Sequence, residues 1–415
     1  MQIKSINVEN FKALRASGTV RLKPLSVIIG NNGSGKSSLV EAIETYVRVI
    51  TTGVDAAMEH WQGFEHIRHK AAQPRQTSVS TMANQPNAMK FALNVKVDDV
   101  AAKLQLDVNT FNQGNLLYIQ REFYEKGRDS VERTAGSTGM TGVHSSNGLQ
   151  PDVERALKTL VGGKSLLPYL GAFDKITLAL GNMLFLRLNP DTIGQLQSVK
   201  RTERRIQLAS DGANIAEYLI DLRERSSSAF ENVTRALQYV LPYASDVEPK
   251  VLDAGVLRRS YVQLLENKYE IPGWLMSSGS LRVLPLIATL LDPEPPPVVF
   301  IEEVENGLDP RTVGLVVDLM RSAAKGGKTQ VIATTHSPYL LDMLNLNDVL
   351  LCERGPKGPA FSWPANRKEM KAWRDRFLPG KLYTMSALQH EPEAPTADNS
   401  PKQGEVPKGG WGEDE

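Results

Sequence analysis

The chain has one cysteine among its 415 residues, Cys352, so no disulfide can form within it. No apolar run approaches the ~20 residues that a membrane-spanning helix needs. The residues after Met1 have the pattern of a strand and not that of a signal peptide. We therefore expect a cytoplasmic protein with a buried, reduced thiol and no membrane partner.

Paired aspartates are also missing. No two aspartates stand two residues apart, so the chain lacks the D-x-D metal pair that a TOPRIM-type nuclease needs. We therefore expect any nuclease that works with this chain to be a separate protein.

The charges of the two signs are nearly balanced. A formal net charge of +1 neither demands nor excludes nucleic acid, because overall balance can hide a local basic groove. Lys200, Arg201, Arg204 and Arg205 form one basic run that could contact DNA phosphates, so DNA stays a possible partner. The acidic Glu203 among them and the helical periodicity around them favour a solvated helix face.

Residues 30–37 have the pattern G-x-x-x-x-G-K-[ST], which is typical of a phosphate-binding loop. The pattern lies between an apolar strand at Leu25–Ile29 and a helix with apolar residues at 3.6-residue spacing. Backbone N–H groups of the loop can bind a β-phosphate, Lys36 can reach the β and γ oxygens, and Ser37 can ligate Mg²⁺. The apolar helix residues are Leu39, Val40, Ile43, Val47 and Ile50. The other predicted binding residues are Asn31, Asn32, Gly33, Ser34, Gly35 and Ser38.

The α/β pattern stops after residue 50 and resumes near residue 275, so a long insertion divides the predicted nucleotide domain. Segments 91–97, 103–108 and 116–122 alternate apolar and polar residues and predict an antiparallel sheet beside the loop. Segment 127–150 is rich in Gly, Ser and Thr and predicts a mobile surface loop. Segment 201–243 has helical periodicity.

These patterns predict an α/β fold with a mixed central sheet, an antiparallel side sheet and a helical insertion. We expect an N-terminal lobe at 1–200, a helical insertion with connecting strands at 201–272, a C-terminal lobe at 273–390 and a disordered tail at 391–415.

Two motifs in the second half could act on a phosphate. Ser277, Ser278 and Gly279 open an apolar helix, where small side chains and free N–H groups could face an anion; an ordinary serine N-cap is the alternative. A buried strand at Val298–Ile301 then ends in Glu302 and Glu303. One carboxylate is suited to the Mg²⁺ shell, and the next to accepting a proton from water.

Two further motifs follow in a fixed order. Asp309 is placed to cap a helix that has Pro310 at its first position. A strand that ends near Thr335 then delivers His336, and Ser337 caps the next helix. Each motif is weak by itself, but the ordered set is specific.

The ordered set resembles the ATP-binding-cassette (ABC) ATPases of the RecF, SMC and OLD-like branch, within the P-loop NTPases. It is most similar to the AAA ATPases of bacterial anti-phage and OLD-like proteins. The segment Glu9-Asn10-Phe11-Lys12 looks like the N-terminal strand of that branch, and 301–308, 335–338 and 211–214 are similar to its other motifs. The resemblance covers about residues 1–50 and 205–350.

The resemblance implies specific roles at the nucleotide. Lys36 and Ser37 would bind phosphate and Mg²⁺, Glu302 would complete the Mg²⁺ shell, Glu303 would polarise the attacking water and His336 would contact the γ-phosphate. The chain would then be an ATPase with ATP and Mg²⁺ as cofactors.

The resemblance also implies an assembly. Ser278 and Gly279 would act on the ATP held by a second subunit, with Asp309 at the same interface, so the protein would be a homodimer or larger. It would gate a separate effector such as a nuclease or toxin, in phage defence. Val304 and Asp309 replace the Pro and His that are common in the OLD-like pattern, and Glu302 stands where transporters usually have Asp.

Two other functions stay open. The chain could be a RecF-like DNA-repair clamp, or a nucleotide-binding subunit of a transporter. The long insertion, the paired glutamates and the Glu9-Asn10-Phe11 start argue against the transporter. Gln195 or Gln197 would be the glutamine of the Q-loop.

Two weaker signals have ordinary explanations. His60, His66 and His69 could line one helical face as metal ligands, but no cysteine accompanies them and solvated histidines are the more common case. Trp61 and Trp274 are expected to anchor packing and not to stack on bases.

Overall fold

A computed structural model describes most of the chain. The described residues are 1–72, 86–111, 116–135, 141–146, 163–199, 205–254, 257–356, 358–368, 370–373 and 376–388. The predicted tail at 391–415 and residues 200–204 of the basic run lie outside them. No helix within these ranges has the length and apolar character needed to span a bilayer.

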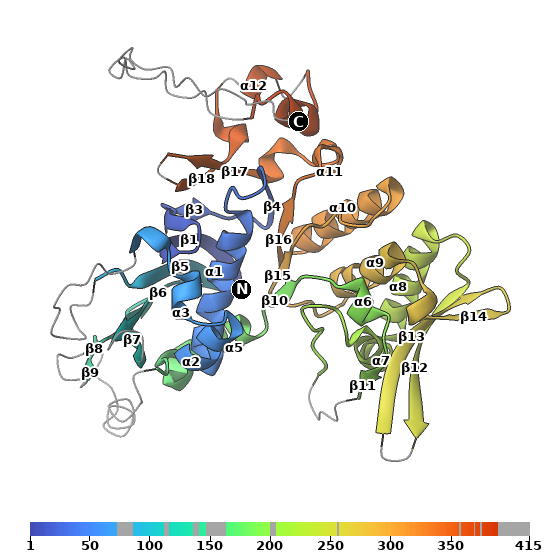
Figure 1. The fold of residues 1–415 in the computed structure, drawn as a ribbon, viewed down its shortest axis with the longest axis horizontal. Helices are drawn as coiled ribbons and strands as arrows, with labels where there is room; N and C mark the ends of the chain where they lie inside the picture. Colours follow the sequence, from blue (N-terminus) through green and yellow to red (C-terminus); the bar gives the residue numbers. More distant parts are fainter. Residues whose placement is uncertain are drawn as a thin grey trace, which may run out of the picture.

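A six-stranded sheet of described residues forms the centre of the molecule, in the order β10-β15-β16-β4-β17-β18 (Figure 1). The first five strands are parallel, and β18 pairs antiparallel with β17. The strands are β4 (Leu25–Ile29), β10 (Leu184–Leu186), β15 (Val298–Ile301), β16 (Gln330–Thr335), β17 (Val349–Gly355) and β18 (Gly358–Ser362). All residues of β4, β15 and β16 are buried, which is typical of parallel strands covered on both faces. The predicted mixed central sheet is confirmed.

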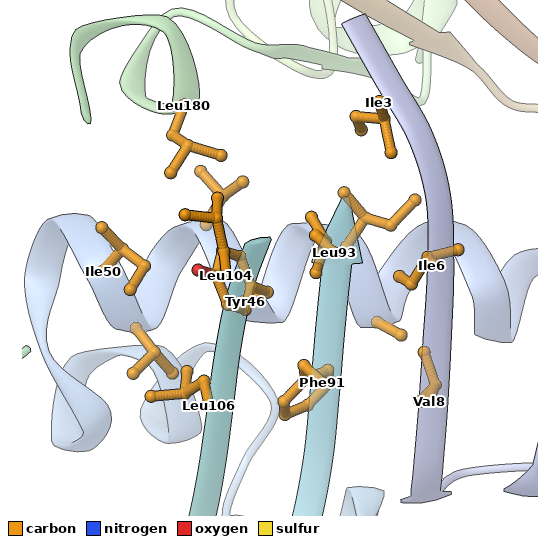
Figure 2. Close-up of a cluster of buried hydrophobic side chains, with 14 of the residues drawn as sticks. Ile3, Ile6, Val8, Tyr46, Ile50, Phe91, Leu93, Leu104, Leu106 and Leu180 are labelled. Carbon is orange, nitrogen blue, oxygen red and sulfur yellow. The ribbon is translucent and has the colours of Figure 1, made fainter. Parts of the chain in front are cut away.

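An antiparallel sheet lies beside the helix that follows the phosphate loop, α1 (Lys36–Thr52). Tyr46 and Ile50 of α1 face Phe91, Leu93 and the apolar residues of the neighbouring strands (Figure 2). The strands are β1 (Gln2–Phe11), β2 (Leu14–Ala16), β3 (Val20–Arg21), β5 (Met89–Val97), β6 (Val100–Phe111), β7 (Leu116–Lys126), β8 (Asp129–Ala135) and β9 (Thr141–Ser145). The predicted side sheet is therefore confirmed, and its strands are longer than expected.

The prediction of a mobile loop at 127–150 is wrong for most of its described part. Strands β8 and β9 pair antiparallel there and extend the side sheet. Val131 and Ala135 are buried, but Arg133 lies between them on the same buried side, and this charge disguises the alternation. Residues 136–140 and 147–150 of the predicted loop lie outside the described residues.

A second hydrophobic cluster holds the helical part of the chain, which Figure 1 shows in green, yellow and orange. Its main helices are α7 (Ile215–Arg225), α8 (Ser227–Val240), α9 (Ser278–Leu290) and α10 (Pro310–Lys325). They adjoin a small sheet of β11 (Gln197–Ser198), β12 (Asp246–Ala254), β13 (Leu257–Glu266) and β14 (Tyr269–Pro272). The remaining helices are α2 (Val54–His60), α3 (Phe64–Ile67), α5 (Asp174–Gly181), α6 (Pro190–Ile193), α11 (Pro338–Asp342), α12 (Met370–Trp373) and α13 (Pro379–Thr384).

The predicted helix over 201–243 begins only at residue 215. Before it, Asn214 accepts a hydrogen bond from the Ala209 N–H and donates one to the Gln207 carbonyl, which fixes a loop. Gly212 has φ +78°, a backbone conformation outside the helical region. Arg205 is also not on a helix face; its guanidinium contacts the buried Asp292 at 2.9 Å.

The most deeply buried ion pair that the structure describes joins β7 to β8. Arg133 and Glu122 are 2.6 Å apart, with side chains 1% and 0% exposed. Tyr124 and Ser165 donate hydrogen bonds to the second oxygen of Glu122. Burial raises the pKa of Glu122, and the Arg133 charge opposes that rise. The pair therefore explains how a charged residue can lie on the inner face of β8.

We predict that Glu122→Ala destabilises the protein by about 3–5 kcal/mol, because it leaves the Arg133 charge buried without a partner. Glu125→Ala on the same strand is the control. Its pair with Lys103 is solvent-exposed at 3.2 Å, so its loss should cost less than about 1 kcal/mol. Urea unfolding of both variants measures the difference, and equal losses would contradict the assignment.

Candidate nucleotide site

Three neighbouring strands bring the predicted motifs to one edge of the central sheet. Strand β16 pairs in parallel with β15 on one side and β4 on the other. The phosphate loop follows β4, Glu302 follows β15 and His336 follows β16. In open parallel sheets, ligands bind at the carboxyl ends of the strands. The structure thus gathers residues more than 300 positions apart in the chain.

The phosphate loop has glycines where a larger residue would clash with its neighbours or strain the backbone. A Cβ on Gly30 would lie 2.1 Å from the Cys352 carbonyl oxygen, and one on Gly35 would lie 2.7 Å from Pro359. Gly33 and Gly35 have φ of +73° and +114°. The loop is therefore a tight backbone cradle, supported from β17 and β18. Burial also raises the pKa of the Cys352 thiol to about 11, in keeping with the expected inert thiol.

The polar groups of the loop are arranged around Lys36. Its Nζ donates to the carbonyls of Gly30 at 2.7 Å and Asn31 at 3.1 Å, and burial lowers its pKa. Ser37 is exposed in the first turn of α1, while the buried Ser34 hydroxyl has no hydrogen-bond partner among the described residues. Asn31 accepts a hydrogen bond from the Tyr383 hydroxyl of α13 at 2.9 Å.

The two acids after β15 have different environments. Glu302 continues the strand, since its N–H donates to the Leu186 carbonyl at 3.0 Å. Burial raises its pKa, and the nearby Arg187 opposes the rise. Glu303 has φ 49°, a strained conformation for a residue with a side chain, and its N–H donates to Thr334 Oγ1 at 3.0 Å. The backbone therefore turns sharply between the two carboxylates.

A third acid, Glu305, holds the predicted histidine. The backbone N–H of His336 donates to Glu305 Oε1 at 2.8 Å, and Nδ1 of the ring lies 3.3 Å from the same oxygen. Oε2 of Glu305 is buried without a hydrogen-bond partner in the described residues. Glu305 thus fixes the start of the segment that carries His336.

The start of α9 lies against the turn before Asp309. Ser277 is the N-cap of α9, because its hydroxyl accepts a hydrogen bond from the Ser280 N–H. This is the alternative that the sequence left open beside an anion site. Ser278 is exposed, and a Cβ on Gly279 would lie 2.6 Å from the Gly307 carbonyl oxygen. Asp309 accepts hydrogen bonds from the Thr312 side chain and from the N–H groups that begin α10, which lower its pKa. The segment 277–279 and the turn at Asp309 are therefore one packed unit.

Several weaker predictions have other outcomes. Gln197 lies on β11, where its side chain donates to the Thr192 carbonyl, and Gln195 precedes that strand. The assignment of one of them to the Q-loop stays a prediction. His60 lies 3.6 Å from Glu44, and the described residues contain no group of three potential metal ligands. Trp274 is 45% exposed, and its ring centroid lies 5.3 Å from that of Tyr261, so its packing is partial.

Trp61 packs against the N-terminal core, as expected. Lys12 lies 4.0 Å from its ring centroid and 2.9 Å from Glu41 of α1. The N-terminal strand therefore reaches the same helix that begins with the phosphate loop.

The sequence did not point to Arg187, Glu305 or Tyr383. Arg187 contacts Glu302 across 115 positions of the chain, and no local motif marks it. Glu305 is the third acid after β15, and this acidic run was a local signal in the sequence that Glu305 belongs to the site.

Two family models match the chain. One, described as "AAA ATPase domain", matches residues 1–134, and the other, described as "AAA domain, putative AbiEii toxin, Type IV TA system", matches residues 189–342. The first range holds the phosphate loop, and the second holds the acids, Asp309 and His336. The chain carries an AAA ATPase domain. The resemblance to ABC-like AAA ATPases is thereby confirmed.

Three solved structures of SMC head domains are similar to this chain, each with 13% identity. An SMC head bound to the C-terminal winged-helix domain of ScpA has a TM-score of 0.49 and covers 89% of this chain and 100% of that one. The head from Thermotoga maritima has 0.41, with 87% and 98% covered. A head with an extended coiled coil, bound to the C-terminal domain of ScpA derived from Pyrococcus furiosus, has 0.45, with 90% and 98% covered. No curated protein matches the sequence.

We predict that Gly279→Ala destabilises the protein by about 1–3 kcal/mol, because the added methyl group overlaps the Gly307 carbonyl. Alanine is the better helix former, so any loss reports on the close contact. Ser278→Ala, one residue earlier and exposed, should change stability by less than about 0.5 kcal/mol. Thermal unfolding compares the two, and a stabilised Gly279→Ala variant would refute the contact.

Proposed function

We propose that this AAA ATPase domain binds Mg²⁺-ATP at the carboxyl edge of the central sheet and hydrolyses it. The observation that supports this most strongly is the adjacency of the phosphate loop, Glu302, Glu303 and His336 on three neighbouring strands. A phosphate loop alone would support binding only. The acids beside it supply the groups that hydrolysis needs.

The residues fit a nucleotide with its metal ion. A glycine cradle leaves room for phosphate oxygens against backbone N–H groups, at the N-terminus of a 17-residue helix. Ser37 is exposed, and Ser34 carries an unpartnered buried hydroxyl. Ser37 and Glu302 would hold Mg²⁺, which supplies charge neutralisation on the β and γ oxygens. The donor set of one hydroxyl and one carboxylate oxygen suits this hard cation.

The chain's own groups would then divide the chemistry. Lys36 exchanges the Gly30 and Asn31 carbonyls for phosphate oxygens. Glu303 orients a water and takes its proton, at a backbone turn that Thr334 fixes. His336, held by Glu305, lies at the end of β16, from which it can contact a γ-phosphate.

We further propose that two chains assemble around ATP. Ser278 and Gly279 lie in the second lobe, at the N-terminus of α9, and Ser278 is exposed. A helix N-terminus carries free N–H groups that favour an anion. The exposed start of α9 would complete the nucleotide site of a second copy, with Asp309 beside it.

The biological role that we propose is the gating of a separate effector in phage defence, in the cytoplasm. The family model that matches residues 189–342 is described as a putative AbiEii toxin of a Type IV toxin–antitoxin system, and this supports a role in a defence system. Binding of DNA stays an open part of the proposal. ATP occupancy would set whether the effector is held or released.

Hydrolysis is tested with one substitution. We expect Glu303→Gln to bind ATP with unchanged affinity but to hydrolyse it about 10²-fold more slowly or worse, because the amide keeps the shape and loses the base. Lys36→Ala is the comparison and should lose nucleotide binding. Phosphate release and equilibrium ATP binding are measured for both. Normal turnover in Glu303→Gln with loss in Glu302→Gln would show that the two acids have exchanged roles.

Assembly is tested by mixing two inactive variants. Lys36→Ala cannot hold ATP, and Ser278→Arg cannot act on the ATP of a partner, so each alone should lose about 10²-fold in rate. A mixture should recover activity, because each heterodimer has one site with an intact Lys36 and an intact partner Ser278. ATPase rate is measured against mixing ratio. A flat background at every ratio would argue against the assembly.

A further inference from the structure

Arg187 directly follows β10, the edge strand beside β15 (Figure 1). Leu186 pairs with Ile301, and the Glu302 N–H donates to the Leu186 carbonyl at 3.0 Å, so the ladder continues past the end of both strands. The Arg187 N–H in turn donates to the Ser210 carbonyl at 2.7 Å. Backbone pairing therefore fixes Arg187 next to Glu302.

The guanidinium of Arg187 joins two carboxylates. Its Nε donates to Glu302 Oε1 at 2.7 Å, and its Nη1 donates to Glu44 Oε2 at 2.6 Å. Nη2 lies 2.7 Å from the same Glu302 oxygen but is buried without a hydrogen bond. The Glu44 side chain is only 3% exposed, so the bridge is anchored in the interior. No interaction of Glu302 Oε2 is recorded in the described part of the chain, and that oxygen can serve a ligand.

Glu44 connects this bridge to the phosphate loop. It lies on α1, seven residues after Ser37. Seven residues are about two helical turns, so the two side chains lie on the same face of α1, about 10 Å apart along its axis. The planar guanidinium of Arg187, bonded to both Glu302 and Glu44, thus links the end of β15 to the helix that carries Ser37.

We propose that Arg187 is the positioning residue of the Mg²⁺ site: it holds Glu302 by Oε1 and so leaves Oε2 to join Ser37 in holding the metal ion. This rests on the proposed function. A planar guanidinium with fixed donors can hold two carboxylates at a set distance, whereas an ammonium is a point charge and an amide has one donor nitrogen. Hydrogen-bonding partners of ligating carboxylates commonly contribute 10- to 100-fold to metal affinity.

Simple charge compensation makes the opposite prediction. If Arg187 only neutralised Glu302 and Glu44, its removal would leave more negative charge at the site and would strengthen the binding of a cation. The sign of the change therefore separates positioning from compensation.

The test compares the affinity for a non-hydrolysable ATP analogue in EDTA and in excess Mg²⁺, by calorimetry. The ratio of the two affinities measures the Mg²⁺ contribution without any turnover. In Arg187→Gln we expect that ratio to fall 10- to 100-fold, with binding in EDTA within a few-fold of wild type. An unchanged or increased ratio would overturn the proposal.

Arg48→Gln is the matched control. Arg48 donates to the other oxygen of Glu44, at 3.0 and 2.8 Å, and the structure records no bond from it to Glu302. Its substitution should leave the Mg²⁺ ratio near the wild-type value. A loss equal to that of Arg187→Gln would show that the effect arises from the charge of Glu44, and would also overturn the proposal.

If the glutamine variant is unstable, Arg187→Lys is the second variant that tests the proposal. Lysine keeps the positive charge but lacks the planar fork that holds both carboxylates at fixed positions, so the ratio should still fall. Full recovery would overturn positioning. Failure of the proposed function looks different. Wild-type protein that binds no nucleotide, or Glu302→Gln with an unchanged ratio, would refute the ATP or metal assignment itself, whatever Arg187 does.

Discussion

The parallel pairing of β16 with both β4 and β15 is the constraint on which the site depends. Its register sets Thr335 against Ile29 and Ala333 against Ile301, so the segments that follow all three strands leave the sheet together. Every residue of these strands is buried, and a register shift in a parallel sheet would move whole rows of apolar side chains. The segments between them can therefore vary in length, as the long insertion after α1 does, without moving the site.

What the sequence predicted correctly has a local physical cause. The phosphate loop needs glycines in positive-φ positions, and helix caps such as Asp309 and Ser337 need a side-chain acceptor at a fixed offset, so these features can be read from adjacent residues. Strands Leu25–Ile29 and Val298–Ile301 were predicted with their observed bounds because both are uninterrupted apolar runs. The roles predicted for Ser37, Glu303 and His336 stay predictions.

What the sequence could not supply depends on pairing between distant segments. Arg133 looks like a loop residue until Glu122 is placed opposite it, and that pair compensates the charge that β8 buries in the sheet. Arg187 is one arginine among many until β10 aligns with β15. A buried charge is costly unless it is paired, so the partners of such residues decide their position, and a local pattern contains no record of the partner.

The turn from Glu302 to Asp309 connects the two functions that we propose for the site. Its first residues are the acids of the proposed nucleotide site, and its Gly307 carbonyl lies against Gly279 at the start of α9. Arg282 of α9 donates to the Asn306 carbonyl at 3.2 Å, which adds a second contact. These contacts pack the turn that carries the acids directly against the start of α9. In the proposed assembly around ATP, the acids of one site and the surface offered to the partner's site would therefore belong to one packed unit.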